Sequence, residues 1–489
     1  MFPFRARSPR PHPLVLALVV AAFMTGCATN PVTGKKELSF VSEAQEIAAG
    51  QESRAATQAE YGFYVDVAWG TKVESLGKLL AAGSHRPDLP WEFHVVDDAA
   101  VNAFAAPGGF VYITRGILPY FNSEAELAGV LGHEIGHITA RHYATSSSRE
   151  QLAGLGLLIG SVFSESIARY GQVAQEGLGL LFLKYSRDQE SESDRLGVDY
   201  SIKAGYDPRE MPATYHTLAR ISATEGARLP TFLSTHPDPA SREATVRALA
   251  IAQVGARTGL NVNRDDYLRR VDGLVFGADP RQGYFENGRF YHPGMKFMMD
   301  FPAGWQTQNG RSAVTAVNEA QKAVMQVSLV DGGSLSPMAF VQKLVNDRQV
   351  TSADGRAETI GGYEAWSGRL GTTDDQGATG VLLAVILRQG PTVMFRMLGQ
   401  ATPGSAAEAA FFASCRSFRA LTDAARLNPE PARVKVVPAP AAGSFGTIIA
   451  GMGAQEISAE ETAILNGVTV GQSVARGRLL KIVSPARLK

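Results

Sequence analysis

Residues 127–142 read LAGVLGHEIGHITARH, and the interpretation of the whole chain starts from this stretch. Three histidines and one glutamate interrupt a run of apolar and small residues. The apolar residues have the spacing of one helix face: Leu127, Val130, Leu131, Ile135 and Ile138. Ser123, with Glu126 three residues later, has the pattern of a capping box at the start of this helix. The stretch therefore predicts a buried helix that carries ionisable side chains.

The two histidines His133 and His137 are four residues apart, which places both imidazoles on one helix face. Zinc suits two imidazoles, a carboxylate and an open fourth position, so one Zn2+ per chain is expected here. Glu134 is rotated by about a third of a turn from His133. It can reach a water molecule beside the ion, which is the position of a general base. The alternative is a core helix with incidental histidines, which would bury polar groups without partners.

The third ligand is expected from residues 184–200, KYSRDQESESDRLGVDY. Glu190 and Asp194 are four residues apart and share a helix face. Glu190 can complete a His2Glu zinc site, and Asp194 can accept the distal N–H of a zinc-binding histidine. Glu192 is an alternative ligand on another face. Taken by itself, this segment is more typical of a solvated acidic helix.

Two further histidines, His236 and His142, have predicted roles of their own. His236, in STHPDPASRE, is expected either to donate to the oxyanion formed during catalysis or to bind the zinc as a removable fourth ligand. A turn-capping histidine is the alternative. Arg242 is predicted to anchor this turn, and a contact with the site is the alternative. His142 lies five residues beyond His137, off the register of the pair, and is predicted to be structural.

Two predicted strands, residues 91–98 and 110–116, flank the stretch AVNAFAAPGG. This stretch offers an extended edge on which a substrate backbone can lie as an added strand. The predicted substrate contacts are Asn102, Phe104, Gly108 and Gly109. For Asn102, stabilisation of the turn is the alternative.

HEIGH, followed some fifty residues later by SRDQESESD, resembles the M48 metallopeptidases. NPVTGKKEL, NAFAAPGGFVYITRGIL and STHPDPASR are similar to segments of the periplasmic lipoprotein branch of that family. The resemblance covers about residues 27–253. It implies these roles: zinc ligands His133, His137 and Glu190, general base Glu134, and orienting carboxylate Asp194. Ser193, where the family usually has alanine, is a departure.

The N-terminus predicts export. Arginines precede the apolar run LVLALVVAAFM, which is too short to span a bilayer comfortably, and TGC follows. The pattern resembles a bacterial lipoprotein signal, residues 1–26, with lipid attached to Cys27 and an outer-membrane location facing the periplasm. An ordinary secretory signal is the alternative. The 489 residues carry 47 basic and 47 acidic side chains, so nucleic acid is not expected as a partner.

The predicted fold class is α+β. We expect a tether and helix over 27–60, then a mainly helical gluzincin-type peptidase domain with a small sheet over 61–255. An α+β accessory domain over 283–422, a Pro/Ala linker over 423–444 and a module over 445–489 follow. ETAILNGVTVGQSVARGRLLKIV in this module is similar to the second half of a LysM repeat, which implies binding to peptidoglycan. Residues 151–183 predict two apolar helices, with a membrane-dipping hairpin as the alternative.

The first functional hypothesis is an envelope-anchored zinc endopeptidase that hydrolyses unfolded or misassembled envelope proteins. The alternative is a largely latent zinc protein that acts as a chaperone or as a peptidoglycan-bound scaffold. An intact Glu134 favours the enzyme, because a scaffold does not need the base.

Overall fold

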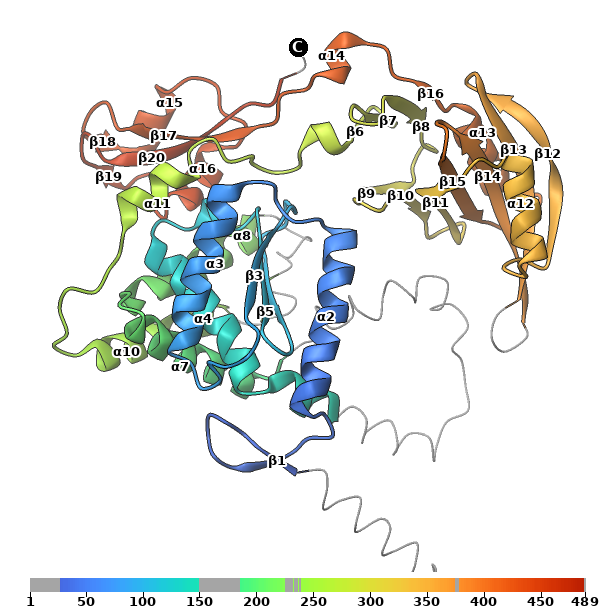
Figure 1. The fold of residues 1–489 in the computed structure, drawn as a ribbon. Helices are drawn as coiled ribbons and strands as arrows, with labels where there is room; N and C mark the ends of the chain where they lie inside the picture. Colours follow the sequence, from blue (N-terminus) through green and yellow to red (C-terminus); the bar gives the residue numbers. More distant parts are fainter. Residues whose placement is uncertain are drawn as a thin grey trace, which may run out of the picture.

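The computed structural model describes residues 27–148, 185–224, 232, 236, 239–373 and 378–487 (Figure 1). The predicted signal over 1–26 and the apolar stretch over 151–183 lie outside these ranges. Within the described ranges, no helix has the length and apolar character needed to cross a membrane. The described chain contains both helices and sheets, as expected for the α+β class.

The predicted peptidase region is built on a small mixed sheet with the strand order β3-β5-β4. β3 (Glu92–Val96) runs parallel to β5 (Phe110–Thr114), and β4 (Ala103–Ala106) is the antiparallel edge strand. Helices pack around this sheet (Figure 1): α2 (Glu43–Glu60), α3 (Val67–Ala82), α4 (Glu124–Thr139), α7 (Arg187–Lys203), η4 (Pro208–Glu210), α8 (Met211–Thr224), α10 (Pro239–Val254) and α11 (Arg264–Val271). The strands and helices expected in this region are therefore present.

The helix α4 is buried along its whole length, as its sequence predicts. Ser123 caps it by accepting a hydrogen bond from the Glu126 backbone N–H at 3.2 Å. The reciprocal half of the predicted capping box is absent, because the Glu126 carboxylate accepts from the backbone N–H of Asn122 instead, at 3.1 Å. The helix ends at Thr139, and Arg141 then adopts a left-handed backbone conformation with φ 58°.

Glycines let α4 and α7 approach each other closely. A Cβ added to Gly132 would lie 3.1 Å from the Cα of Gly197, and one added to Gly136 would lie 3.0 Å from the Cα of Ser193. Any larger side chain at these positions would push the two helices apart. The close approach brings the histidines of α4 within reach of the carboxylates of α7, so this packing forms the site.

The predicted tether is more ordered than expected. β1 (Cys27–Thr29) pairs with β2 (Lys36–Leu38), and η1 (Leu118–Tyr120) precedes α4. Asn30 donates from Nδ2 to the carbonyl oxygen of Ala140 at 3.3 Å, which holds this hairpin at the end of α4. Ser42 then caps α2 with a full capping box, which the side chain of Gln45 completes.

The accessory region contains two antiparallel sheets. A four-stranded sheet has the order β16-β8-β7-β6, from Arg419–Ala420, Phe297–Asp300, Arg289–His292 and Tyr284–Glu286. A seven-stranded sheet has the order β12-β13-β14-β15-β11-β10-β9. Its strands are Ser352–Ile360, Tyr363–Thr373, Thr379–Arg388, Val393–Gln400, Ala323–Asp331, Ala313–Asn318 and Gln306–Asn309. Helices α12 (Pro337–Asn346) and α13 (Ala406–Arg416) pack against it, and η5 (Pro280–Gln282) precedes both sheets.

Residues 423–444 form regular secondary structure, so the prediction that they are a linker is wrong. They contain α14 (Ala424–Leu427), β17 (Arg433–Pro438) and β18 (Gly443–Ser444). β17 pairs with β20 (Leu479–Ser484), and α15 (Phe445–Ala450), α16 (Ala459–Leu465) and β19 (Ser473–Val474) complete the C-terminal unit. The surrounding prolines and alanines hide the alternation in RVKVVP, in which Val434 belongs to the peptidase core.

The C-terminal unit packs directly against the predicted peptidase region (Figure 1). Val434 donates its backbone N–H to the carbonyl of Leu274 at 2.9 Å. The buried ammonium of Lys481 donates to the carbonyl oxygens of Pro119 at 2.6 Å and Phe121 at 2.8 Å, just before α4 begins. The unit is therefore part of the same packed body as the helix that carries the two site histidines.

Candidate metal centre

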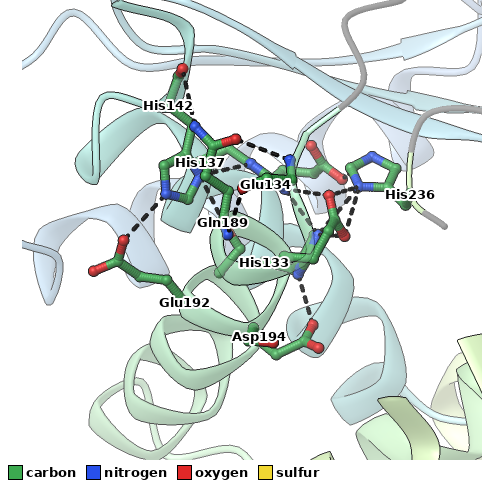
Figure 2. Close-up of polar contacts among 12 residues, drawn as sticks. His133, Glu134, His137, His142, Gln189, Glu192, Asp194 and His236 are labelled. Carbon is green, nitrogen blue, oxygen red and sulfur yellow. Dashed lines mark hydrogen bonds and ion pairs between the residues drawn. The ribbon is translucent and has the colours of Figure 1, made fainter. Parts of the chain in front are cut away.

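Four buried side chains from three segments converge on one point (Figure 2). α4 supplies His133 and His137, α7 supplies Glu190, and His236 comes from the segment before α10. His137 Nε2 lies 3.0 Å from His133 Nε2, and His236 Nδ1 lies 3.0 Å from Glu190 Oε1. One ligand atom from each of the four residues lies within 4.8 Å of the other three.

This donor set fits a zinc ion. Two neutral imidazole nitrogens 3.0 Å apart can share only one proton, so a cation between them and the carboxylate satisfies all the lone pairs. Burial, followed by the proximity of His133, holds the pKa of His137 well below its ordinary value. Burial raises the pKa of Glu190, but His236, His133 and Arg242 together hold it below the ordinary value. Neutral imidazole and ionised carboxylate are the metal-binding forms.

Glu134 lies beside the donor set and not within it. Its Oε1 is buried and has no hydrogen-bond partner among the residues described here. The nearest ionisable nitrogen, His236 Nε2, lies 3.6 Å from that oxygen. Burial raises the pKa of Glu134, and His236 and His133 oppose this effect. A buried carboxylate oxygen without a hydrogen bond is uncommon in folded proteins, and positions of this kind are candidates for functional groups.

Asp194 orients the first histidine. Its Oδ1 lies 2.9 Å from His133 Nδ1, so the imidazole proton sits on Nδ1 and Nε2 is free to bind a metal. The hydroxyl of Tyr215 also donates to this carboxylate, at 2.6 Å. Burial would raise the pKa of Asp194, but the hydrogen bonds from Arg242 and His133 hold it well below its usual range. The geometry predicted for Asp194 is present.

Arg242 contacts the site, which is the alternative role that the sequence left open for it. The guanidinium lies on α10, and its Nη1 is 2.7 Å from Glu190 Oε2. The favoured prediction, an anchor for the turn alone, does not account for this contact. The local sequence could not decide between the two roles, since Arg242 comes close to the two carboxylates only when α10 packs on α7.

The sequence reasoning also missed the partner of the second histidine. His142 Nδ1 lies 2.9 Å from His137 Nδ1, and Glu192 Oε2 lies 3.2 Å from His142 Nε2 (Figure 2). Glu192 does not join the donor set and faces His142 instead. Tyr185 stacks on the His137 ring at a centroid distance of 4.1 Å. His142, which the sequence predicts to be structural, therefore contacts the second histidine of the pair although it lies off the helical register.

The predicted substrate contacts lie along β4 and the turn after it. Asn102 is buried, and its Oδ1 has no hydrogen-bond partner within the described ranges. Phe104 packs in a hydrophobic cluster and stacks on Tyr112. A Cβ on Gly108 would clash with the backbone of Ile47, and Gly109 also has positive φ, so both glycines are required by the fold. Contact of these residues with substrate stays a prediction.

The edge strand β4 adjoins the donor set. Ala105, Ala106 and Pro107 line a small cavity of about 10 Å³ together with His137 and Tyr185. The end of β4 therefore lies next to His137 of the donor set.

The region that holds the site is similar to a known peptidase family. Residues 70–250 match Peptidase family M48. The chain is 36% identical over 168 residues to the mitochondrial metalloendopeptidase OMA1 of Arabidopsis thaliana, covering 34% of this chain and 33% of that protein. It is 31% identical over 222 residues to the beta-barrel assembly-enhancing protease of Yersinia pestis, covering 42% and 44% of the two chains.

These matches support a metalloendopeptidase, and the matched region contains all three segments that carry the donor set. The chain spans about a third to a half of the length of these curated relatives. Among solved structures, LpqN of Mycobacterium tuberculosis is 13% identical and covers 26% of this chain, with a TM-score of 0.21. A likeness at this level supports no structural argument.

Proposed function

We propose that this protein is a zinc endopeptidase of the bacterial envelope that hydrolyses unfolded or misassembled envelope proteins. The observation that carries the proposal is the buried set of His133, His137 and Glu190, with the unpaired carboxylate oxygen of Glu134 beside it. The donor set accounts for metal binding, and the Glu134 oxygen without a hydrogen bond accounts for proton transfer. A purely structural metal site would have no use for the second feature.

The side chains divide the chemistry between them. When bound, zinc would lower the pKa of a water molecule and polarise the scissile carbonyl. Glu134 accepts the proton of the attacking water and then delivers it to the leaving nitrogen. Its burial favours this role, because a raised pKa makes the carboxylate a stronger base. The edge of β4, with Asn102 and Phe104, holds the substrate backbone as an added strand.

His236 supports a second candidate, a latent state of the same site. Its Nδ1 belongs to the donor set and lies 3.4 Å from His133 Nε2. Phe232 stacks on its ring at 4.5 Å, which holds the imidazole in this position. We propose that His236 fills the fourth position, so that it must leave before water and substrate can enter. Replacing His236 by Ala should then raise cleavage at unchanged zinc content, whereas an oxyanion donor would make the same variant less active.

The envelope location is proposed from two observations. The sequence predicts a lipoprotein signal with lipid on Cys27, and the relative from Yersinia pestis is named for beta-barrel assembly. Peptidoglycan binding by the LysM-like C-terminal unit is a further proposal. Since that unit is packed on the peptidase region, its binding should be tested on the whole mature chain. If the mature chain does not co-sediment with peptidoglycan sacculi, the proposal of peptidoglycan binding is wrong.

The peptidase proposal is tested by incubating residues 27–489 with casein as an unfolded substrate. The wild type and Glu134→Gln are compared at equal zinc content. Cleavage by the wild type alone supports the assigned base. Equal cleavage by both proteins contradicts it, and cleavage by neither favours the latent candidate.

A further inference from the structure

We propose that His142 and Glu192 act as a relay that positions the metal ligand His137. The inference rests on the proposed zinc site and adds two positioning residues to it. His133 is oriented directly by Asp194, as described above, whereas no carboxylate of the described chain is recorded within bonding distance of His137 Nδ1. His137 therefore reaches a carboxylate only through a second imidazole.

The contacts form an unbroken line from the metal site to the protein surface. His137 Nδ1 lies 2.9 Å from His142 Nδ1, and His142 Nε2 lies 3.2 Å from Glu192 Oε2. Both histidines are buried, whereas the side chain of Glu192 is 24% exposed. The carboxylate of Glu192 therefore lies at the rim of the site, where solvent reaches it.

The Glu192 carboxylate determines which ring nitrogen of His142 and of His137 carries the proton. Glu192 can only accept, so His142 carries its proton on Nε2 and offers a lone pair at Nδ1. That lone pair accepts the Nδ1 proton of His137, which leaves His137 Nε2 as a lone pair facing the donor set. The opposite arrangement would put two lone pairs against each other at Glu192. It would also put a proton on the nitrogen that lies 3.0 Å from His133 Nε2.

The backbone is shaped to bring His142 back toward His137. α4 ends before this residue, and the left-handed conformation of Arg141 turns the chain. Arg141 is held in place by the Val41 carbonyl oxygen, to which its Nη2 donates at 2.7 Å. Gln189 also donates from Nε2 to the carbonyl of His142, at 3.4 Å. A histidine five positions after His137 therefore faces it, although a continuous helix would have turned it away.

Zinc affinity and ligand geometry test the relay without relying on activity. His142→Phe keeps the ring volume and removes the acceptor, and Glu192→Ala removes the carboxylate at a partly exposed position. His142→Gln restores an acceptor oxygen. The matched control is His94→Phe, which breaks a half-buried His–Glu pair whose His94 Nε2 lies 2.9 Å from Glu92 Oε2, away from the site. Each protein, as residues 27–489, is titrated with zinc against a chelator and substituted with cobalt.

Loss of an orienting partner typically weakens metal affinity by about 10- to 100-fold. We expect a loss of that order in His142→Phe, a smaller loss in Glu192→Ala and partial recovery in His142→Gln. The visible cobalt spectrum should change in His142→Phe and stay unchanged in His94→Phe. Wild-type affinity and spectrum in both His142→Phe and Glu192→Ala would overturn the relay while leaving the zinc site intact. A wild type that binds no metal would overturn the proposed function as well.

Discussion

The guanidinium of Arg242 binds both carboxylate oxygens of Asp194, with Nη2 2.5 Å from Oδ1 and Nε 2.8 Å from Oδ2. Both side chains are buried, and Asp194 in turn holds the imidazole of His133. This ion pair therefore joins α10 to α7 and α4 at the metal centre. The orientation of His133, a proposed zinc ligand, therefore depends on Arg242, which lies about fifty positions after Asp194 in the sequence.

Arg242→Met should destabilise the protein by about 3–5 kcal/mol, since it leaves the Asp194 carboxylate buried without its cation. Arg242→Lys should rescue little, because an ammonium cannot reproduce the two parallel hydrogen bonds. Urea unfolding followed by circular dichroism measures both variants. A loss below about 1 kcal/mol in Arg242→Met would show that the pair contributes little to folding. Arg247→Met, at an exposed pair on the same helix, is the control.

Gly136→Ala should weaken zinc binding and destabilise the fold by about 1–3 kcal/mol, the usual cost of overpacking. The added methyl group would lie 3.0 Å from the Cα of Ser193, so α7 must move away with Glu190. Gly70→Ala is the matched control, because its methyl group has no neighbour within 4 Å in α3. The control should be neutral or more stable, by up to about 1 kcal/mol. Similar losses in both variants would contradict the close helix packing.

Lys481→Met should destabilise the peptidase region, although the residue lies near the C-terminus. The substitution removes the donor for two buried carbonyl groups, each worth about 1–3 kcal/mol when left unpaired. Unfolding should be measured by hydrogen exchange, which resolves α4 separately. Reduced protection in α4 would confirm that the C-terminal unit supports the helix. Unchanged protection there would contradict the packing of the two parts as one body.

His292 should make the accessory region sensitive to mild acid. Its Nδ1 accepts a hydrogen bond from the Met295 backbone N–H at 3.2 Å, and burial lowers its pKa to about 4. The unfolded chain has the ordinary pKa of about 6.5 and therefore binds more protons between these values. Stability is fully present above pH 6.5 and is lost as the pH falls toward 4. His292→Phe should flatten this dependence in calorimetry at pH 7.5, 6 and 5, whereas the exposed His216→Phe should not.

Much of the metal centre could be predicted from local spacing. The four-residue intervals placed His133 beside His137 and Glu190 beside Asp194 on single helix faces, and these faces meet in the structure. Spacing failed for His142, because the left-handed residue Arg141 breaks the helical register on which the reasoning depended. It failed for Arg242 because that contact exists only through the packing of α10 on α7.

In the domains, too, local patterns predicted some elements, and elements that depend on distant pairing were missed. The sequence predicted an α+β accessory region, and β11 shows the alternating burial on which such a prediction depends. The strand over 433–438 was missed, since composition over a longer window outweighed a short alternation. Its identity as a strand depends on pairing with β20, which lies more than forty residues later.

The most direct measurement is the zinc content of purified residues 27–489, determined by elemental analysis for the wild type, Glu190→Ala and Glu134→Gln. The account predicts one zinc per chain in the wild type and in Glu134→Gln, because Glu134 stands outside the donor set. It predicts a large loss of zinc in Glu190→Ala. Full zinc content in Glu190→Ala, or a wild type without metal, would contradict the assignment of the centre.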